Sequence, residues 1–449
     1  MKRKLIDKLI LWKNSSHRKP LFLLGASGVG KSYLAYDFGK SFYQHMIYLD
    51  LSLQEEVTKE WVEGQVPFEQ AAREVAVSEE IIRGNIDTEE PVSEGIAGSS
   101  ILLIIDNVRW NIHSKHIKEF LKVQQDSEQY DILLLSNYWT PSYGKGLKAA
   151  YLTLYPLDFE EFLLATGNGW YVDSIKNHYI SCKKLPAIVH NELLDLFHTF
   201  LTIGGMPLVI NEYISSEGTY NIRRQHKLLY QSFLYQLHYD QAESKNLDIP
   251  KAEHIFQTIP AQLLKENQKF KFSLIKKGAT ANKYHGGIQL LQYSYYSIPC
   301  YRINDEEPIK VTSAISEKNL KYGFKLYQSD VGLLHTAMWE ELSASEREIH
   351  NAVAMKALFD NHVAITLASK GHTLKYWESN SQAKMDFVLI KNKELIPIEV
   401  KPTTYTRSKG FSVFKEQYPE TKQLIKLSTR NFGSSNQVKF VPIYAAFCI

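Results

Sequence analysis

Cysteine is scarce in this chain of 449 residues, and the three that occur, Cys182, Cys300 and Cys448, lie far apart in the sequence. That spacing excludes a disulfide scaffold and a zinc ribbon, and no pair of histidines has HxxxH or HExxH spacing. No stretch reaches the roughly 18 uncharged apolar residues of a membrane-spanning helix. Residues 1–12 lack the apolar core of a signal peptide. We therefore expect a cytoplasmic protein without a membrane partner.

Net charge is also low, at +3, but its distribution along the chain is uneven. Residues 52–100 are rich in glutamate, whereas residues 251–330 and 368–449 carry more lysine and arginine than acid. A basic C-terminal half is typical of proteins that bind DNA, although solvated surface lysines give the same pattern. Hydrophobic residues make up 44% of the chain, which is enough for packed cores and excludes a largely disordered protein.

Short apolar runs alternate with helical patterns through the first 160 residues. This alternation predicts an α/β fold with a parallel sheet covered by helices. The predicted strands are Leu21–Leu24, Met46–Leu51, Ile101–Ile105, Ile132–Leu135 and Tyr151–Leu154, with a helix over 31–42 after the first. From residue 157 to 241 the pattern is helical, and the tyrosine-rich stretch 293–303 predicts a hairpin. Strands are expected again around residues 386–401.

A phosphate-binding loop is the most specific motif, because residues 25–32 match GxxxxGK[ST] in full between a predicted strand and a helix. Glycines let backbone N–H groups face the phosphates, and the helix N-terminus adds positive potential. Lys31 is predicted to contact the β- and γ-phosphates of ATP, and Ser32 to bind Mg²⁺. The predicted nucleotide-binding residues are Gly25, Ala26, Ser27, Gly28, Val29, Gly30, Lys31 and Ser32.

Such a loop needs a second carboxylate for the metal at the end of a neighbouring strand, and Asp106 follows an apolar run in that position (Walker B). The next residue is Asn107, whose amide can orient a water but cannot take its proton, so slow hydrolysis is expected. Asn137, after the next strand, is a candidate contact for the γ-phosphate; an Asx turn explains it equally well. Lys31, Asp106 and Asn137 are thus the predicted ATPase residues.

A second constellation lies near the C-terminus, where Asp386, Glu399 and Lys401 have the spacing D-x12-E-x-K. The period of two puts Glu399 and Lys401 on one face of an apolar strand. Asp386 and Glu399 are candidate ligands of a second Mg²⁺, and Lys401 would then stabilise charge on a phosphate, as in a nuclease. A structural Glu–Lys pair is the alternative.

Taken in order, these motifs resemble a large prokaryotic family of AAA-type ATPases whose C-terminal domain is distantly similar to PD-(D/E)XK nucleases. The resemblance also rests on PLDFEEF at 156–162, GGMP at 204–207, FKLY at 324–327, DVGLL at 330–334, MDF at 385–387 and IEVK at 398–401. The GMP step is similar to the GxP element of switch-type (STAND-like) ATPases. The resemblance implies an ATPase core over 1–156, a helical segment with the GxP element over 157–250, a winged helix over 251–335 and a PD-(D/E)XK-like domain over 336–449.

Three residues depart from that family: Asn107 replaces an acid, His350 stands where relatives often have a metal-binding glutamate, and Met385 stands where they often have Glu or Ala. Neutral histidine is a poor ligand for Mg²⁺, so little DNA cleavage is expected in Mg²⁺ and any residual activity in Mn²⁺.

Three functions stay open at this point. They are a slow ATPase that acts as a switch on a DNA-binding domain, an ATP-regulated nuclease, and a non-enzymatic protein-interaction module with ATP as a structural ligand. For an ATPase, self-association could supply an arginine finger.

Overall fold

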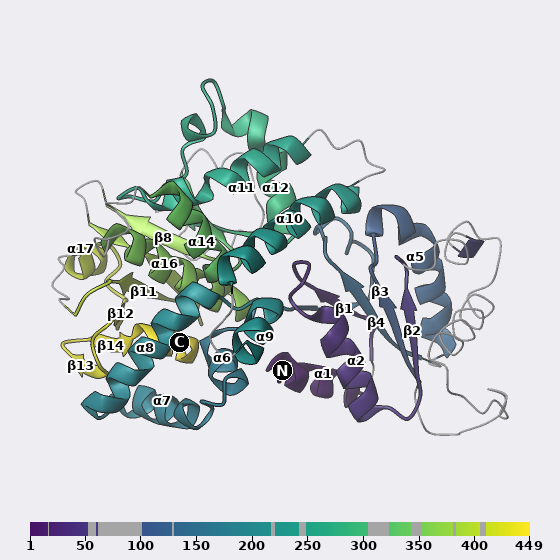
Figure 1. Ribbon diagram of the computed structural model, residues 1–449, viewed down its shortest axis with the longest axis horizontal. Helices are drawn as coiled ribbons and strands as arrows, with labels where there is room; N and C mark the ends of the chain where they lie inside the picture. Colours follow the sequence, from purple (N-terminus) through teal and green to yellow (C-terminus); the bar gives the residue numbers. More distant parts are fainter. Residues whose placement is uncertain are drawn as a thin grey trace. The chain divides into compact units, whose positions relative to one another are not determined.

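The computed structural model describes residues 1–16, 18–52, 60–61, 101–127, 130–216, 221–241, 248–303, 323–342, 352–379, 383–404 and 410–449 (Figure 1). The chain forms two compact units, and each is considered by itself. We call residues 3–154 and 236–245 the N-terminal unit, and residues 1–2, 155–235 and 246–449 the C-terminal unit.

The N-terminal unit is built on a five-stranded parallel sheet in the order β2-β3-β4-β1-β5. Its strands are β1 (Leu21–Leu24), β2 (Met46–Asp50), β3 (Ile101–Asp106), β4 (Tyr130–Ser136) and β5 (Ala150–Thr153). The helices described here are α1 (Leu5–Lys13), α2 (Lys31–Phe42) and α5 (Trp110–Ser127). The predicted α/β fold is confirmed, and every predicted strand is present to within two residues at each end.

The three central strands of this sheet, β3, β4 and β1, are buried along almost their whole length, which is why they are continuous apolar runs. All four residues of β1 are buried. Phe22 of β1 packs edge-on against Trp110 of α5, with ring centroids 5.5 Å apart, and lies 4.5 Å from the ring of Trp139. Because the strands are parallel, their carboxyl ends lie along one edge of the sheet, which is where ligands bind in folds of this type.

The C-terminal unit contains most of the helices. They are α6 (Phe159–Ala165), α7 (Trp170–Ser181), α8 (Ala187–Ile203), α9 (Pro207–Ser215), α10 (Ile222–Gln241), α11 (Ile249–Leu263), α12 (Ala281–Tyr293), α14 (Val331–Glu341), α16 (Ala352–Ser369) and α17 (Gly410–Gln417), with 3-10 turns η1 (Phe272–Leu274) and η2 (Ile443–Cys448). Helix α10 belongs to both units, because its residues from 236 onward are part of the N-terminal unit. The predicted helical stretch from 157 to 241 is confirmed.

Two mixed sheets complete the C-terminal unit, in the orders β7-β6-β8-β9 and β10-β11-β12-β14-β13. Their strands are β6 (Ser297–Arg302), β7 (Phe324–Gln328), β8 (Lys375–Glu378), β9 (Lys384–Met385), β10 (Phe387–Lys391), β11 (Glu394–Val400), β12 (Leu424–Ser428), β13 (Gly433–Ser435) and β14 (Val438–Pro442). The hairpin predicted over 293–303 is wrong. Tyr293 ends α12, and the range 293–303 contains a single strand, β6. The antiparallel partner of β6 is β7, which lies outside that range.

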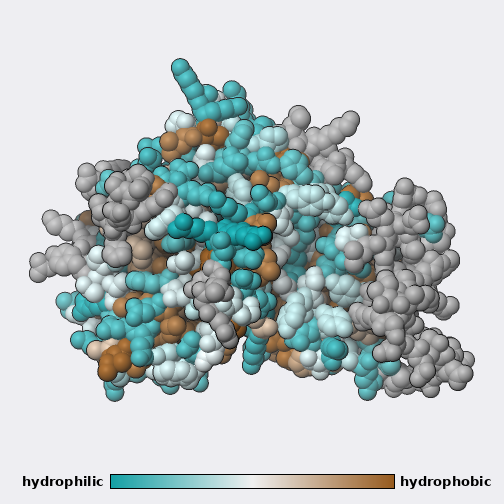
Figure 2. Space-filling model, in the orientation of Figure 1, coloured by the Kyte–Doolittle hydropathy of each residue, from teal (hydrophilic) through white to brown (hydrophobic). Residues whose placement is uncertain are grey.

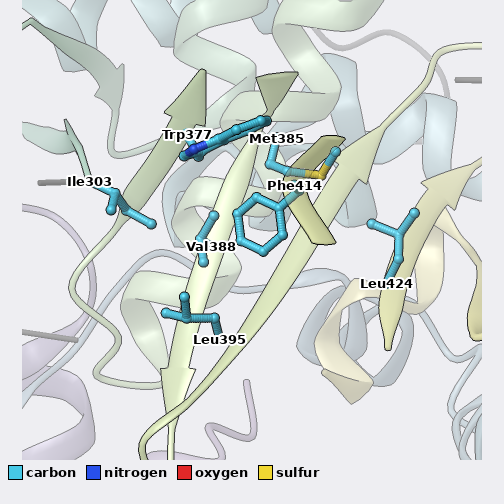
Figure 3. Packing of buried hydrophobic residues seen from close by; sticks show 7 residues of the cluster. All are labelled: Ile303, Trp377, Met385, Val388, Leu395, Phe414 and Leu424. Carbon is cyan, nitrogen blue, oxygen red and sulfur yellow. The ribbon is translucent and has the colours of Figure 1, made fainter. Parts of the chain in front are cut away.

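A hydrophobic cluster holds the strands of the second sheet in place (Figure 3). Val388, Leu395 and Leu424 come from β10, β11 and β12, and they pack with Trp377 of β8 and Phe414 of α17. The rings of Trp377 and Phe414 meet edge to face, with centroids 5.1 Å apart. This cluster therefore fixes the strands whose ends carry Asp386 and Glu399.

Three motifs that are far apart in sequence interlock around Asp330 in the C-terminal unit. The Asp330 carboxylate caps α14 by accepting from Leu333 N at 2.9 Å, and it accepts from Gly205 N at 2.7 Å. Gly205 O in turn accepts from Leu157 N at 2.8 Å. A Cβ on Gly204 would lie 2.4 Å from Asp330 Oδ1, and Gly204 has a φ of +79°, so this turn requires glycine. The segments 156–162, 204–207 and 330–334 thus form one packing unit.

Hydrophilic side chains cover most of the described surface on the face shown in Figure 2, and hydrophobic ones appear in small separate groups. Ile180 of α7 and Ile188 of α8 are among the exposed hydrophobic residues, at 77% and 74% exposure. Among the described helices, none is by itself both long and apolar enough to cross a membrane. The pair α8 and α9, bent by 119°, meets that criterion only when the two are taken together.

Candidate functional site

The loop between β1 and α2 has the backbone shape of a phosphate-binding loop. Gly25, Gly28 and Gly30 have φ angles of +150°, +78° and +94°, and Gly30 is the N-cap of α2. Glycine adopts such angles at little cost, and they curve the backbone so that successive N–H groups can line an anion site. The N-terminus of α2 adds positive potential at the same place.

Two contacts hold this loop against the rest of the N-terminal unit. A Cβ on Gly25 would lie 2.2 Å from the Leu154 carbonyl oxygen, so the loop begins in direct contact with the end of β5. Farther along, Arg3 donates from Nη1 to the Val29 carbonyl at 2.7 Å and is itself buried. The loop is therefore held at both ends by its own unit.

Lys31 lies at the centre of the loop, with only 6% of its side chain exposed. Its ammonium group donates to the carbonyl oxygens of Gly25 and Ala26, each at 2.8 Å, and to Asn137 Oδ1 at 2.6 Å. The structure thus brings together Lys31 and Asn137, two residues that the sequence analysis singled out separately. These contacts hold the Lys31 ammonium inside the loop, beside the end of β4.

Asp106 is the last residue of β3, and it is buried, with 3% of its surface exposed. Its carboxylate accepts from the hydroxyl of Tyr48 and, at 2.6 Å, from Asn107 N. The Tyr48 hydroxyl also makes a hydrogen bond with Ser32, and burial followed by the charge of Asp106 raises the pKa of Tyr48. Ser32 and Asp106, the predicted magnesium ligands, therefore converge on a single hydroxyl group.

The sequence analysis missed Asp50, the last residue of β2. It is the direct neighbour of Asp106 in the parallel register, and its Oδ1 accepts from Asn107 Nδ2 at 2.8 Å. Ser52 donates to the same oxygen from its backbone N at 2.9 Å and from Oγ at 2.7 Å. Asn107 has a φ of +55°, a region that asparagine tolerates better than glutamate does. The available signal was that β2, like β3, is an apolar run that ends in aspartate.

The helix shared by the two units reaches the loop that follows Asp106. Within the N-terminal unit, the Arg109 guanidinium lies 4.5 Å from the ring centroid of Tyr239, near the end of α10. Arg109 is three residues after Asp106 in the sequence. This end of α10 therefore lies near the loop that follows Asp106.

The C-terminal constellation is organised around a lysine that the sequence analysis did not consider. Lys356 of α16 donates to both carboxylate oxygens of Asp360 at 2.6 Å and to Asp386 Oδ1 at 2.9 Å. The second oxygen of Asp386 accepts from Val400 N at 2.8 Å. The Lys356 ammonium thus takes up the carboxylate oxygens that a divalent cation would need.

Glu399 is engaged in the same way, by two other lysines. Its Oε1 lies 3.1 Å from Lys401 Nζ and its Oε2 lies 3.1 Å from Lys426 Nζ. Lys426 is the direct neighbour of Glu399 in the register of β11 and β12. We refer to this group as the carboxylate–lysine cluster: Lys356, Asp360, Asp386, Glu399, Lys401 and Lys426.

Positive charge predominates around the cluster. Burial opposes ionisation of Asp386, but the charges of Lys356 and Lys325 outweigh it and hold the pKa of Asp386 below its ordinary value. For Asp360 burial is the larger effect. It raises the pKa of that carboxyl above its ordinary value, although the charge of Lys356 acts in the opposite direction. Within the described ranges, no group of three His, Cys, Asp or Glu residues could hold a metal ion. His350, the other candidate ligand, lies outside those ranges.

Comparisons with family models match two parts of the chain. Residues 355–446 match a family described as a domain of unknown function, DUF4143, and residues 194–346 match another, DUF8612. Each match covers less than half of the chain. No curated protein matches it.

Several solved structures show partial similarity to this chain. A Walker-type ATPase of Pyrococcus abyssi is 14% identical, with 75% of this chain and 95% of that chain covered, at a TM-score of 0.42. DnaA of Aquifex aeolicus bound to AMPPCP is 13% identical, with 64% and 85% covered, at 0.28. Drosophila ORC bound to DNA is 14% identical, with 75% and 94% covered, at 0.29.

Replacing Lys356 with alanine should lower the free energy of unfolding by about 3 kcal/mol or more, because it leaves two buried carboxylates without their counter-charge. Lys422→Ala is the control, since Lys422 pairs with Glu394 at an exposed position and its removal should leave the unfolding midpoint unchanged. Guanidinium chloride unfolding followed by circular dichroism measures both. Equal midpoints for the two variants would mean that Lys356 does not neutralise the cluster.

Proposed function

We propose that the N-terminal unit binds ATP with Mg²⁺ and hydrolyses it slowly, and that the chain is a nucleotide-dependent switch coupled to a C-terminal domain that binds DNA without cleaving it. The observation that carries this proposal is the loop between β1 and α2, where Gly25, Gly28 and Gly30 have positive φ angles and the buried Lys31 ammonium donates to Gly25 O, Ala26 O and Asn137 Oδ1. A backbone of this shape at the N-terminus of α2 turns N–H groups and positive potential toward an anion, and the phosphates of ATP supply one.

In this proposal the loop N–H groups and Lys31 bind the phosphates of ATP, and Ser32 and Asp106 hold the metal. The convergence of Ser32 and Asp106 on Tyr48 supports that assignment, because hydroxyl and carboxylate oxygens are the ligands Mg²⁺ prefers. When bound, Mg²⁺ neutralises charge on the β- and γ-phosphates. Asn137, which contacts Lys31, is then near the γ-phosphate and can orient it.

Asp50 is our candidate for the group that accepts a proton from the attacking water. Asn107 cannot do so, but its amide donates to Asp50 Oδ1 and so fixes that carboxylate beside Asp106. Two nearby arginines are already engaged, Arg3 with the Val29 carbonyl and Arg109 with the Tyr239 ring. We therefore place the arginine finger on a second copy of the chain, and we expect slow turnover in its absence.

Coupling to the C-terminal unit would run through α10. Its first part belongs to the C-terminal unit, and its last residues contact Arg109, close to Asp106. The GxP element at 205–207 contacts Asp330 and so belongs to the same packing unit as α14. A change in the position of α10 on nucleotide binding is thus the proposed signal between the domains. These are the ATPase core at 1–156, the helical segment at 157–250, the winged helix at 251–335 and the nuclease-like domain at 336–449.

DNA binding without cleavage follows from the charges of the carboxylate–lysine cluster. Divalent metal would have to displace Lys356 from Asp360 and Asp386, and Lys325 and Lys384 add further positive charge nearby. The same excess favours phosphate oxygens as ligands. The exposed Lys384 and the partly exposed Lys401 are the candidate phosphate contacts.

Lys31→Ala should weaken ATP binding at least about tenfold, because one charge-assisted contact is worth about 1.5–3 kcal/mol. Lys40→Ala, on the exposed side of the same helix α2, is the matched control and should bind normally. Fluorescence anisotropy of a labelled ATP analogue measures both affinities. Undiminished binding by folded Lys31→Ala would remove the assignment of this loop as the ATP site.

Asp50→Asn should reduce ATP turnover by a factor of about 10² to 10⁴ while ATP binding is retained, because asparagine keeps the acceptor oxygen but cannot accept the proton. Asp37→Asn, an exposed change on α2, should leave turnover unaffected. Phosphate release under single-turnover conditions distinguishes the two. Unchanged turnover in Asp50→Asn would place the base elsewhere, for example on a neighbouring subunit.

The unmodified protein should bind duplex DNA with an affinity that falls as salt rises, and it should leave the DNA intact in Mg²⁺. The double variant Lys384→Ala/Lys401→Ala should bind more weakly, with a salt dependence reduced by about two phosphate contacts. Lys422→Ala is the control, because its partner Glu394 begins β11 and Glu399 lies near the other end. Cleavage in Mg²⁺ that is lost in Asp386→Ala would instead establish the nuclease.

A further inference from the structure

Tyr48, the third residue of β2, reaches across the sheet to the end of β3. In the parallel register of these two strands Asp50 is the neighbour of Asp106, and Tyr48 precedes Asp50 by two residues. Successive side chains of a strand alternate between its faces, so Tyr48 and Asp50 lie on the same face. From this position the long Tyr48 side chain reaches the Asp106 carboxylate, and its hydroxyl donates to Asp106 Oδ2.

Helix α2 brings Ser32 to the same hydroxyl group. Ser32 and Tyr36 are four residues apart, so they lie on one face of α2. Both contact Tyr48, because the Ser32 hydroxyl is hydrogen-bonded to the Tyr48 hydroxyl and the two tyrosine rings meet edge-on, with centroids 6.5 Å apart and planes at 74°. Tyr48 is therefore held between the first turns of α2 and the end of β3.

The direction of these two hydrogen bonds follows from the protons that are present. A tyrosine hydroxyl carries one proton, and Tyr48 donates it to Asp106. The bond between Tyr48 and Ser32 must therefore use the proton of Ser32, with the Tyr48 oxygen as the acceptor. The Ser32 proton is thus directed toward Tyr48, and the lone pairs of the Ser32 oxygen point elsewhere.

The same chain of donors orients the Asp106 carboxylate. Tyr48 donates to Oδ2, and Asn107 N donates to Oδ1 at 2.6 Å. Each carboxylate oxygen has two lone pairs, so these two bonds use one lone pair of each oxygen and leave the other. Mg²⁺ binds such oxygens, and the hydrogen bonds that orient its ligands commonly change metal affinity by a factor of about 10 to 100.

From these contacts we infer that Tyr48 is a positioning residue for magnesium: its hydroxyl orients Ser32 and Asp106 so that the remaining lone pairs of both can bind one cation. The inference rests on the proposed function, because it requires ATP and Mg²⁺ at the loop between β1 and α2. Tyr48 acts through its two partners and binds neither the metal nor the nucleotide. If its hydroxyl instead occupied the place of the cation, removing that hydroxyl would make magnesium bind more tightly.

Tyr48→Phe should reduce the contribution of Mg²⁺ to ATP affinity. The affinity for a labelled ATP analogue is measured by fluorescence anisotropy in Mg²⁺ and in EDTA, and the ratio of the two affinities isolates the effect of the metal. The unmodified protein should bind more tightly in Mg²⁺. Tyr48→Phe should lower the ratio about tenfold, or to one if the unmodified ratio is smaller, while the affinity in EDTA is unchanged.

Tyr43→Phe is the matched control. The Tyr43 hydroxyl also donates to a buried aspartate, Asp131, at 2.9 Å, but Asp131 lies near the start of β4 rather than at the carboxyl end of the sheet. This variant loses the same kind of hydrogen bond in the same unit, so a purely structural effect would appear in both variants. Its ratio should equal that of the unmodified protein, and circular dichroism checks that both variants are folded.

The outcomes separate this inference from the proposed function. An unchanged or higher ratio in folded Tyr48→Phe would overturn the positioning role and leave the ATP site in place. An equal decrease in Tyr43→Phe would also overturn it, because the effect would then not be specific to the magnesium ligands. If the unmodified protein binds no ATP analogue, or binds it equally well in Mg²⁺ and in EDTA, the proposed site itself fails and the inference fails with it.

Discussion

The buried carboxylate of Asp330 is the interaction on which the C-terminal unit depends. It caps α14, accepts from Gly205 and thereby anchors the turn that holds the segment starting at Leu157. Burial raises the pKa of Asp330 to about 6, against the backbone N–H groups that favour its ionised form. Three motifs that are far apart in the sequence therefore rest on a single side chain.

The two candidate functional sites contain lysines in different settings. Lys31 lies in a glycine-rich loop at the N-terminus of α2 and donates to Gly25 O, Ala26 O and Asn137 Oδ1. Lys356 is held by two carboxylates, which neutralise its charge and are themselves neutralised. The first lysine belongs to a loop whose backbone has the shape of a phosphate site. The second makes carboxylates unavailable to a metal, and this difference is the physical basis for proposing ATP chemistry in one unit and binding without cleavage in the other.

Prediction from the sequence was most successful where spacing along the chain is enough. The five strands of the N-terminal sheet, helix α2 and the strand that carries Glu399 were recognisable from apolar runs and glycine spacing. The contact between Lys31 and Asn137 was not, because 106 residues separate them and only the strand order makes them neighbours. Asp50 was missed for the same reason. The wrong prediction of a hairpin at 293–303 has the same cause, because the partner of β6 is β7, which starts at Phe324 and not next to β6 in the sequence.

The sequence by itself determined that the protein has a phosphate-binding loop before a helix, an acidic residue after a buried strand and an ExK strand near the C-terminus. These are local patterns, and local backbone geometry follows from them. Tertiary structure alone decided that Asn107 supports Asp50, and that Lys356 and Lys426 take up the carboxylates of the C-terminal motif. The charge around a side chain depends on which elements pack against it, and no pattern along a single strand or helix contains that information.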